Sequence, residues 1–299
     1  MKRAVSISIG SSKRNKAVEV ELLGERVSIE RIGTDGDMEK AAQLYKEMDG
    51  SVDAFGVGGA DLGVMVDDKW YPLYSVQPMV RYIQKTPVVD GTGLKNTLEN
   101  RAAPFLDEKI GSYIKDRKAF VATGADRWGL GQSFLKSGYE CVFGDLMFGL
   151  GLPVPIRSER GLKTLAALLM PIAGRLPFDW IYPTGAKQEE RIPKWEKYYH
   201  WAAVVAGDCH YVKRHIPERL EGKIVVTNTT TPVDVELFRK IGIKYLVTTT
   251  PVLEGRSFGT NMMEAALIAV SGKGRKLTYD ELNELLDRLG FEPQLQELN

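Results

Sequence analysis

The sequence contains little of what disulfide-rich, metal-rich or polyanion-binding proteins require. Among its 299 residues are two cysteines and three histidines. These counts argue against a disulfide framework and against a metal site built from cysteine and histidine. Lysine and arginine number 40 and aspartate and glutamate 39, with the two signs interspersed. A nucleic acid is therefore not the expected partner, because such partners usually require a basic excess.

Long apolar runs are also missing. The N-terminus leads into a short alternating segment and not into the apolar core of a signal peptide. The most apolar later stretches, 142–156 and 165–174, are interrupted by Asp145 and two prolines or are too short to cross a bilayer. We therefore expect a cytoplasmic protein that meets a small-molecule substrate and no membrane, and a homodimer is left open.

The pattern along the chain predicts two α/β parts and a C-terminal helix. Residues 1–115 mix hairpin signals with helical spacing, including a long helix over 95–115, and predict an N-terminal α/β substrate domain. Strands and helices alternate over 116–272, which predicts a Rossmann-like nucleotide-binding domain with a doubly wound parallel sheet. Residues 273–299 form the C-terminal helix and tail, because Thr278 and Glu281 match a capping box. In 116–272 we expect strands at 119–123, 140–143, 204–206, 223–227 and 245–249, and helices at 130–137, 159–174, 189–202, 232–241 and 261–271.

A glycine-rich turn after the first strand of this second part indicates phosphate binding. Glycine lets the backbone approach a diphosphate, and the following helix start offers unpaired N–H groups. An acid about 20 residues further on can accept hydrogen bonds from ribose hydroxyls. The spacing departs from G-x-G-x-x-G, so a plain tight connection between strand and helix remains the alternative. The predicted cofactor residues here are Thr123, Gly124, Arg127, Gly129, Gly131 and Asp145.

Polar loops follow three later strands, at the edge where open α/β sheets bind ligands. Thr227, Asn228 and Thr229 end one strand and Thr249 ends the next, so their polar groups are further candidates for cofactor binding. The alternative for this loop is helix capping by Thr231 ahead of Pro232. After an earlier strand, His210 is a candidate acid or base because its ordinary pKa lies near neutrality.

An aspartate and a lysine in the first part form a candidate proton-transfer pair. Asp90 and Lys95 lie close in sequence, and such a pair can move a proton during carbonyl–alcohol interconversion if burial tunes the lysine. The alternative is an Asp-Gly turn followed by a solvated lysine. Glycines 56, 58 and 59 with Asp61 form another strand end that either lines the cleft or makes a plain turn. Arg256 is a candidate for holding an anionic group at a later helix start.

Three stretches carry a resemblance to a known family. Residues 33–40, 225–232 and 259–266 are similar to stretches of bacterial proteins called quinate 5-dehydrogenase, and the overall plan resembles the shikimate/quinate dehydrogenase family. The resemblance implies hydride transfer between a cyclic polyol and a nicotinamide, with a lysine and an aspartate at the substrate, for which Lys95 and Asp90 are the matching types. It also implies substrate contacts from the helix that holds Asn261 and Glu264.

These observations predict an NAD-dependent dehydrogenase, with NADP as an alternative cofactor, that interconverts a hydroxyl and a ketone on a small polyol or hydroxy acid. Two other hypotheses remain open at this point. One is a different Rossmann-type enzyme, such as a transferase that uses S-adenosylmethionine or a nucleotide-sugar. The other is a nucleotide-binding protein without catalysis. No metal is expected.

Overall fold

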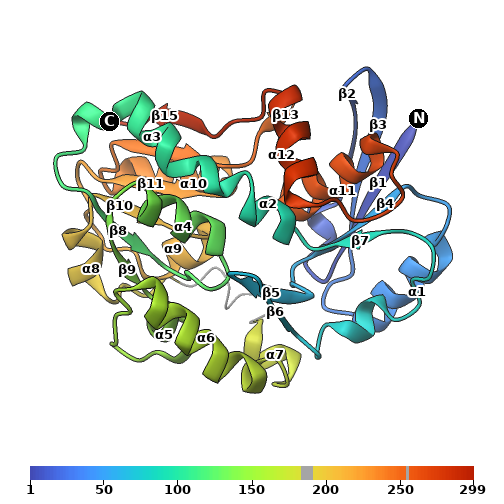
Figure 1. The fold of residues 1–299 in the computed structure, drawn as a ribbon, viewed down its shortest axis with the longest axis horizontal. Coiled ribbons are helices and arrows are strands. Elements are labelled where there is room, and N and C mark those ends of the chain that lie inside the picture. Colours follow the sequence, from blue (N-terminus) through green and yellow to red (C-terminus); the bar gives the residue numbers. More distant parts are fainter. Residues whose placement is uncertain (183–190, 254–255) are drawn as a thin grey trace.

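The computed structural model describes residues 1–182, 191–253 and 256–299, and it describes side chains in these ranges except at positions 252–257. Two β-sheets lie side by side, each covered by helices (Figure 1). The first sheet has the strand order β2-β3-β1-β4-β7, in which only β2 runs antiparallel to its neighbour. Its strands are β1 (Lys2–Ser8), β2 (Lys16–Leu22), β3 (Glu25–Gly33), β4 (Ala54–Gly58) and β7 (Val88–Val89).

The second sheet has the order β15-β12-β11-β10-β8-β9, and its first five strands in chain order are parallel. The chain passes from β8 to β9 on one side and then crosses to β10 on the other side. This reversal at β8 is the point at which doubly wound sheets bind ligands. The strands are β8 (Lys118–Val121), β9 (Glu140–Phe143), β10 (Val204–Ala206), β11 (Ile224–Thr227), β12 (Tyr245–Thr248) and the antiparallel β15 (Gln294–Glu297).

The predicted fold class is confirmed: this is an α/β protein with parallel sheets, and its second sheet is doubly wound. The central strands β1, β4, β10 and β11 are mostly apolar and buried on both faces, as parallel strands require. The remaining elements of the second half are α4 (Trp128–Lys136), α5 (Asp145–Leu150), α6 (Glu159–Ala173), α7 (Phe178–Ile181), α8 (Glu196–Trp201), α9 (Cys209–His215), α10 (Pro232–Lys240), β13 (Val252–Leu253) and β14 (Arg256–Ser257). None of the described helices combines the length and apolar character that crossing a membrane requires.

The C-terminal helices belong to the first sheet and not to the second, which corrects the predicted assignment of residues 261–271. Helix α11 (Thr260–Ser271) packs on β1 and β4, and α12 (Tyr279–Arg288) shares its apolar core. The chain then returns to the second sheet, where β15 pairs with β12. Sequence order alone could not show these two crossings, because α11 is apolar nearly all round and fits either sheet.

The segment that joins the two sheets is a broken helix, where one long helix was predicted. It consists of α2 (Thr92–Asn96), η3 (Glu99–Arg101), α3 (Ala102–Ile110) and η4 (Gly111–Tyr113). A helix running through this region would place the ring of Pro104 against the carbonyl of Asn100, so α3 begins where Pro104 falls in its first turn. Leu94 and Leu98 lie in the core of the first sheet, whereas Ala103 and Leu106 lie in that of the second.

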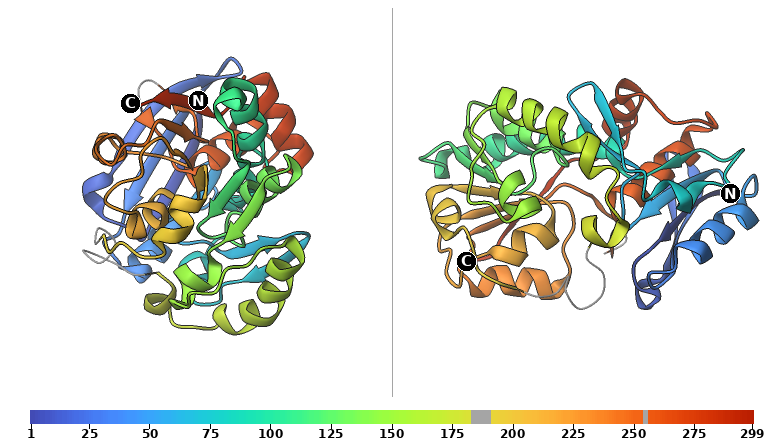
Figure 2. Two further views of the ribbon diagram at one scale, coloured as in Figure 1. Left: turned by 90° about the vertical axis from the view of Figure 1, so that its left-hand side faces the viewer. Right: turned by 90° about the horizontal axis from the view of Figure 1, so that it is seen from below.

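Two segments of the chain also pack across the boundary between the halves. The hairpin of β5 (Gly63–Val66) and β6 (Lys69–Pro72) leaves the first half and buries Val66 and Tyr71 in the core of the second. In the other direction, α6 and α7 reach across to the first half, where Phe178 packs on its core (Figure 2). The other elements of the first half are η1 (Ser12–Arg14), α1 (Met38–Met48) and η2 (Gln77–Val80).

Candidate functional site

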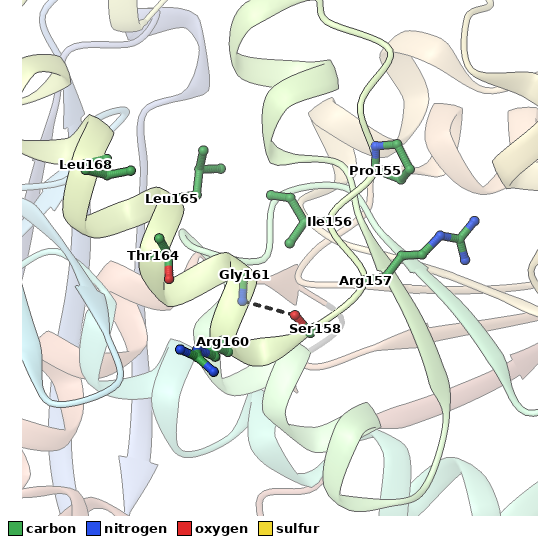
Figure 3. A pocket seen from close by; sticks show the side chains of 9 residues that line it. All are labelled: Pro155, Ile156, Arg157, Ser158, Arg160, Gly161, Thr164, Leu165 and Leu168. Atoms are coloured by element: carbon green, nitrogen blue, oxygen red, sulfur yellow. Dashed lines mark hydrogen bonds between the residues drawn. The ribbon is translucent and has the colours of Figure 1, made fainter.

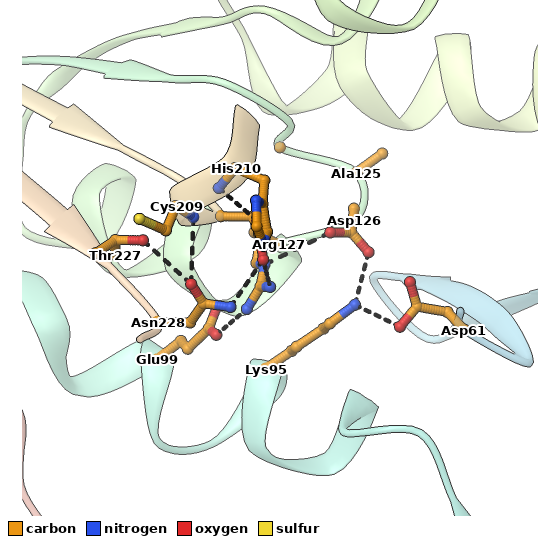
Figure 4. A network of polar contacts seen from close by, with 12 residues as sticks. Asp61, Lys95, Glu99, Ala125, Asp126, Arg127, Cys209, His210, Thr227 and Asn228 are labelled. Carbon is orange, nitrogen blue, oxygen red and sulfur yellow. Dashed lines mark hydrogen bonds and ion pairs between the residues drawn. The ribbon is translucent and has the colours of Figure 1, made fainter. Parts of the chain in front are cut away.

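A network of buried charges lies where the two halves meet (Figure 4). Its members come from four places: the loop after β4, the joining segment α2–η3, the turn after β8 and the loop after β10. The last two flank the reversal point of the second sheet. We call this set the interdomain charge cluster, and its residues are Asp61, Lys95, Glu99, Asp126, Arg127 and Asp208.

Lys95 is the centre of one half of the cluster. Its Nζ lies 2.8 Å from Asp61 Oδ1 and 2.7 Å from Asp126 Oδ1, and only 6% of its side chain is exposed. Burial disfavours the ammonium group, but the two carboxylates outweigh it and raise the pKa of Lys95 above its usual range. Lys95 is therefore a fixed cation and cannot act as a base in this arrangement.

The predicted partner of Lys95 was Asp90, and the structure shows a different pairing. Asp90 accepts hydrogen bonds from the backbone N–H groups of Leu62 and Thr92, at 2.7 and 3.0 Å. It thus shapes the loop that carries Asp61 and the start of α2. The partners of Lys95 come from other segments because α2 is docked between the two sheets.

Arg127 is the centre of the other half of the cluster. It is ion-paired with Glu99 on one side and with Asp208, at 2.7 Å, on the other. The side chains of Arg127 and Glu99 are only 5% and 1% exposed. Despite the cost of burial, these carboxylates raise the pKa of Arg127 above its usual range. The predicted role of Arg127 was phosphate binding, but its Nη1 and Nη2 donate to the protein's own carboxylates, while its buried Nε has no hydrogen-bond partner among the described residues.

The cluster has four carboxyl groups and two cations, and burial makes some of these carboxylates costly. Burial raises the pKa of Asp61 to about 6. The negative charges of Asp126 and Asp90 add to this shift, and the positive charge of Lys95 opposes it. Burial likewise raises the pKa of Glu99 to about 7 against the attraction of Arg127. Glu99 Oε2 is buried with no hydrogen-bond partner among the described residues. Asp61 thus has a pKa close to that of an effective general base at neutral pH.

Solvent reaches the cluster at Asp61 and Asp126, whose side chains are 19% and 25% exposed. Tyr182, at the end of α7, holds Asp61 from the other side: its hydroxyl accepts the N–H of Asp61 at 2.9 Å and donates to Asp61 Oδ2 at 3.2 Å. Asp61 is therefore positioned by Lys95 through one oxygen and by Tyr182 through the other.

The glycine-rich turn after β8 has the predicted strand, turn, helix, strand and acid in order, but protein atoms fill it. Asp145 accepts the N–H groups of Gly124 and Ala125, at 3.0 and 2.8 Å. Added Cβ atoms at Gly124 and Gly131 would meet the ring of Phe143. Close packing of strand and helix therefore explains these two glycines.

Gly129, the middle glycine of the three, decides whether a diphosphate fits. A Cβ atom at Gly129 would lie 2.1 Å from the carbonyl oxygen of Lys95, because the backbone of α2 rests on the start of α4. In dinucleotide-binding turns the corresponding space is left for the diphosphate. The carboxylates of Asp126 and Asp145 also lie at this turn and would repel phosphate. The residues present therefore do not fit a diphosphate at the predicted place.

This packing predicts that replacing glycine with alanine has opposite effects on stability at Gly129 and at Gly149. Gly129→Ala forces a methyl group against the backbone of α2 and should cost about 1–3 kcal/mol of unfolding free energy. In the matched control, Gly149→Ala on α5 meets no atom within 4 Å and should stabilise the protein by about 0.5–1 kcal/mol. Urea unfolding measures both. If Gly129→Ala matches the wild type in stability, α2 does not pack here as described.

The other predicted cofactor residues mostly bond to the protein itself. Thr227 donates to Asn228 Oδ1, and the Asn228 amide donates to Asp208 at 2.7 Å. Thr229 is half-buried in the same loop. Thr123 and Thr249 each have a buried Oγ1 without a hydrogen-bond partner among the described residues.

The predicted acid or base His210 is exposed at the first turn of α9, beside the cluster (Figure 4). Its backbone N–H bonds to Asp208 Oδ1 at 2.9 Å, so Asp208 caps α9 while its other oxygen binds Arg127. Cys209 is buried, and burial raises its thiol pKa above the usual range.

Two of the predicted substrate contacts, Glu264 and Asn261, lie on α11 in the first half. Glu264 is buried and accepts the N–H of Gly93 at 3.0 Å, so it supports the start of α2. Asn261 donates to Ser6 Oγ at 2.6 Å on β1. Arg256 is in β14, and its side chain lies outside the described part of the structure. Neither Glu264 nor Asn261 belongs to the interdomain charge cluster.

Two surface cavities lie away from the cluster. One, of about 540 Å³, is an open depression at the start of α6, between Pro155 and Leu168 (Figure 3). The other, of about 240 Å³, lies between the start of β1 and the end of α11. Neither contains a member of the cluster. Across the described residues, no group of three His, Cys, Asp or Glu side chains is arranged to hold a metal ion.

Sequence reasoning found Lys95 and Arg127 and named Asp61 as a possible cleft residue, but it missed Glu99 and Asp126. Asp126 was passed over although it sits inside the highlighted turn, and Glu99 was lost in the predicted long helix. The sequence did contain a pattern that could have predicted the cluster. Acidic residues lie in the loops after β8 and β10, at Asp126 and Asp208, and these two loops meet at the sheet's reversal point.

Fold and site together define a doubly wound α/β protein with a polar site at the reversal point of its second sheet. The chain belongs to a family described as a domain of unknown function (DUF8754), whose profile matches residues 93–298. A second profile, also a domain of unknown function (DUF8753), matches residues 3–90. No curated protein matches the chain.

Several solved structures are similar at low identity. An NAD-dependent malic enzyme from Thermotoga maritima is 13% identical over 95% of this chain and 75% of its own, with a TM-score of 0.40. A malic enzyme from Entamoeba histolytica is 10% identical over 84% of this chain and 51% of its own, with a TM-score of 0.36. A Mycobacterium smegmatis protein in complex with β-D-fucofuranose is 10% identical over the full length of both chains, with a TM-score of 0.33. These TM-scores are too low to establish a common fold or function.

Proposed function

We propose that the chain is an enzyme that moves a proton at the carbon next to a carbonyl group of a small polar molecule. The observation that carries this proposal is the position of Lys95 between Asp61 and Asp126, at the meeting point of the two halves. Buried carboxylates with raised pKa values next to a fixed cation are typical of acid–base sites.

Asp61, Lys95 and their neighbours have roles that their environment supports. Asp61 is the base, because its pKa of about 6 leaves it ionised yet able to accept a proton at neutral pH. The ammonium group of Lys95 has three N–H donors, and two of them are directed at Asp61 and Asp126. The third can bind a substrate oxygen that gains negative charge. Tyr182 and Asp126 keep Asp61 and Lys95 in place.

Proton exchange at carbon tests this proposal whatever the net reaction is. The protein is incubated in D₂O with a panel of small hydroxyketones and keto acids, and deuterium at carbon is followed by NMR and mass spectrometry. We expect exchange that depends on ionised Asp61 and is half-maximal near pH 6. Asp61→Asn should lower its rate about hundredfold.

The control is Asp53→Asn, which alters a surface carboxylate paired with Lys2 far from the cluster. It should leave exchange unchanged. Absence of exchange into every compound, or equal rates for Asp61→Asn and Asp53→Asn, would end the proposal.

A second candidate is NAD(P)-dependent dehydrogenation of a small polyol or hydroxy acid, quinate-like or shikimate-like in substrate. Asp145 favours it, because it stands at the end of β9 and has lone pairs beyond the two that bind the turn. The buried hydroxyls of Thr123 and Thr249 at the same sheet edge add further polar groups for a nucleotide. A dinucleotide would have to bind with its diphosphate away from Gly129.

Titration with NAD, NADH, NADP and NADPH, followed by nucleotide fluorescence and calorimetry, distinguishes the two candidates. Saturable binding that Asp145→Asn weakens supports the dehydrogenase. Proton exchange without any nucleotide binding supports the first candidate.

A further inference from the structure

The end of β1 holds a second polar site that the proposed function does not use. β1 lies between β3 and β4, and the chain passes from β3 through α1 to β4 on the opposite side of β1. The end of β1 is therefore the reversal point of the first sheet. Loops at such a point are where parallel α/β sheets place their ligands.

Two guanidinium groups meet above Gly10 at this point. A Cβ atom added to Gly10 would lie 3.0 Å from Arg14 Nη2 and 3.1 Å from Arg31 Nη2. Arg31 is fixed from below: its Nη1 donates to the carbonyl of Ser11 at 3.0 Å and its Nη2 to Ser8 Oγ at 2.9 Å. Arg14 reaches the same space from the exposed η1 turn.

Neither guanidinium is neutralised by an ion pair with a described residue. No carboxylate in the described part of the chain lies within 4.0 Å of a nitrogen of Arg14 or Arg31. The nearest acidic influence is Asp35, whose Oδ1 is held by the N–H of Ser12 at 2.7 Å. Burial and the charge of Arg14 lower the pKa of Arg31 to about 10, against the attraction of Asp35. Two like charges are thus held together over a glycine, and an anion between them would relieve their repulsion.

We propose that the space above Gly10, between Arg14 and Arg31, binds an oxyanion: the phosphate or the carboxylate group of a small molecule. Guanidinium groups bind both through paired N–H donors, and the hydroxyl of Ser8 lies at the same place. The absence of a side chain at Gly10 lets both guanidinium groups approach the backbone at this point. This site stands independently of proton transfer at Lys95, because it rests on other residues and another sheet.

Calorimetric titration of the full chain at low ionic strength tests the proposal, with inorganic phosphate in one arm and malonate in the other. We expect saturable binding of at least one anion, and the one that binds more tightly identifies the group. Arg31→Gln and Arg14→Gln should each weaken it at least about tenfold, since each removes a charged hydrogen-bonding partner.

The matched control is Arg26→Gln, which removes an exposed guanidinium on β3 that is paired with Glu19. It should leave binding unchanged. Arg14 is exposed and its side chain makes no hydrogen bond or ion pair with a described residue, so Arg14→Gln remains informative even if Arg31→Gln fails to fold. Failure of both anions to saturate, or equal weakening by Arg14→Gln and Arg26→Gln, would overturn the site. Neither result depends on whether proton exchange occurs at Asp61.

Discussion

Replacing Arg127 with methionine is expected to lower the free energy of unfolding by about 3–5 kcal/mol, because it removes one partner from buried ion pairs. Glu99 and Asp208 would then be left without their cation, at side-chain exposures of 1% and 17%. Methionine nearly fills the volume, so the loss reflects charge and not a cavity. Urea unfolding at neutral pH measures the difference.

The pH dependence of this loss identifies its cause. Burial already raises the pKa of Glu99 to about 7, and removal of Arg127 would raise it further. Glu99 is therefore protonated at about pH 5, and the variant should lose less stability there than at about pH 8. The double variant Arg127→Met with Glu99→Gln should recover part of the stability at the higher pH.

Arg26→Met is the control, because Arg26 and Glu19 form an ion pair with side chains that are 69% and 52% exposed. Exposed pairs contribute about 0–1 kcal/mol. A loss of unfolding free energy below about 1 kcal/mol for Arg127→Met would contradict the description of Arg127 as the partner of buried carboxylates.

The second large effect concerns Glu264, whose replacement by glutamine should stabilise the protein at alkaline pH. Burial and the charge of Asp90 raise its pKa from 4.5 to about 8, against the N–H groups of Gly93 and Gly91. The folded protein thus keeps a proton that the unfolded chain releases. The contribution of Glu264 to stability is present below about pH 4.5 and is lost as the pH rises through about 8.

The wild type should therefore lose stability relative to Glu264→Gln by roughly 1.4 kcal/mol per pH unit between about pH 5 and 8. Glutamine keeps an oxygen that can accept the N–H of Gly93, so the two proteins should be similar at about pH 5. Urea unfolding at both pH values tests this. The control Glu236→Gln changes an exposed carboxylate on α10 and should show no such trend. A constant difference between wild type and Glu264→Gln across this range would contradict a buried, protonated Glu264.

Local patterns predicted much of the fold. The succession of β8, the glycine turn, α4, β9 and Asp145 follows from residues near each other in sequence, as does the capping box that begins α12 at Thr278. The broken joining helix was missed because Leu94 and Leu106 have helical spacing while facing different cores. The contacts of Lys95 could not be predicted locally, because its carboxylate partners come from loops 34 positions before it and 31 after it.

By itself, the sequence determined the α/β class, the parallel second sheet and the set of polar residues at its strand ends, because periodicity and turn residues act over short distances. Only the tertiary structure decided which of these groups meet and which space stays open. In that structure α2 packs on Gly129, where a diphosphate was expected, and Asp145 accepts hydrogen bonds from the backbone of the turn itself. Such contacts depend on how separate segments dock, and no short stretch of sequence encodes that.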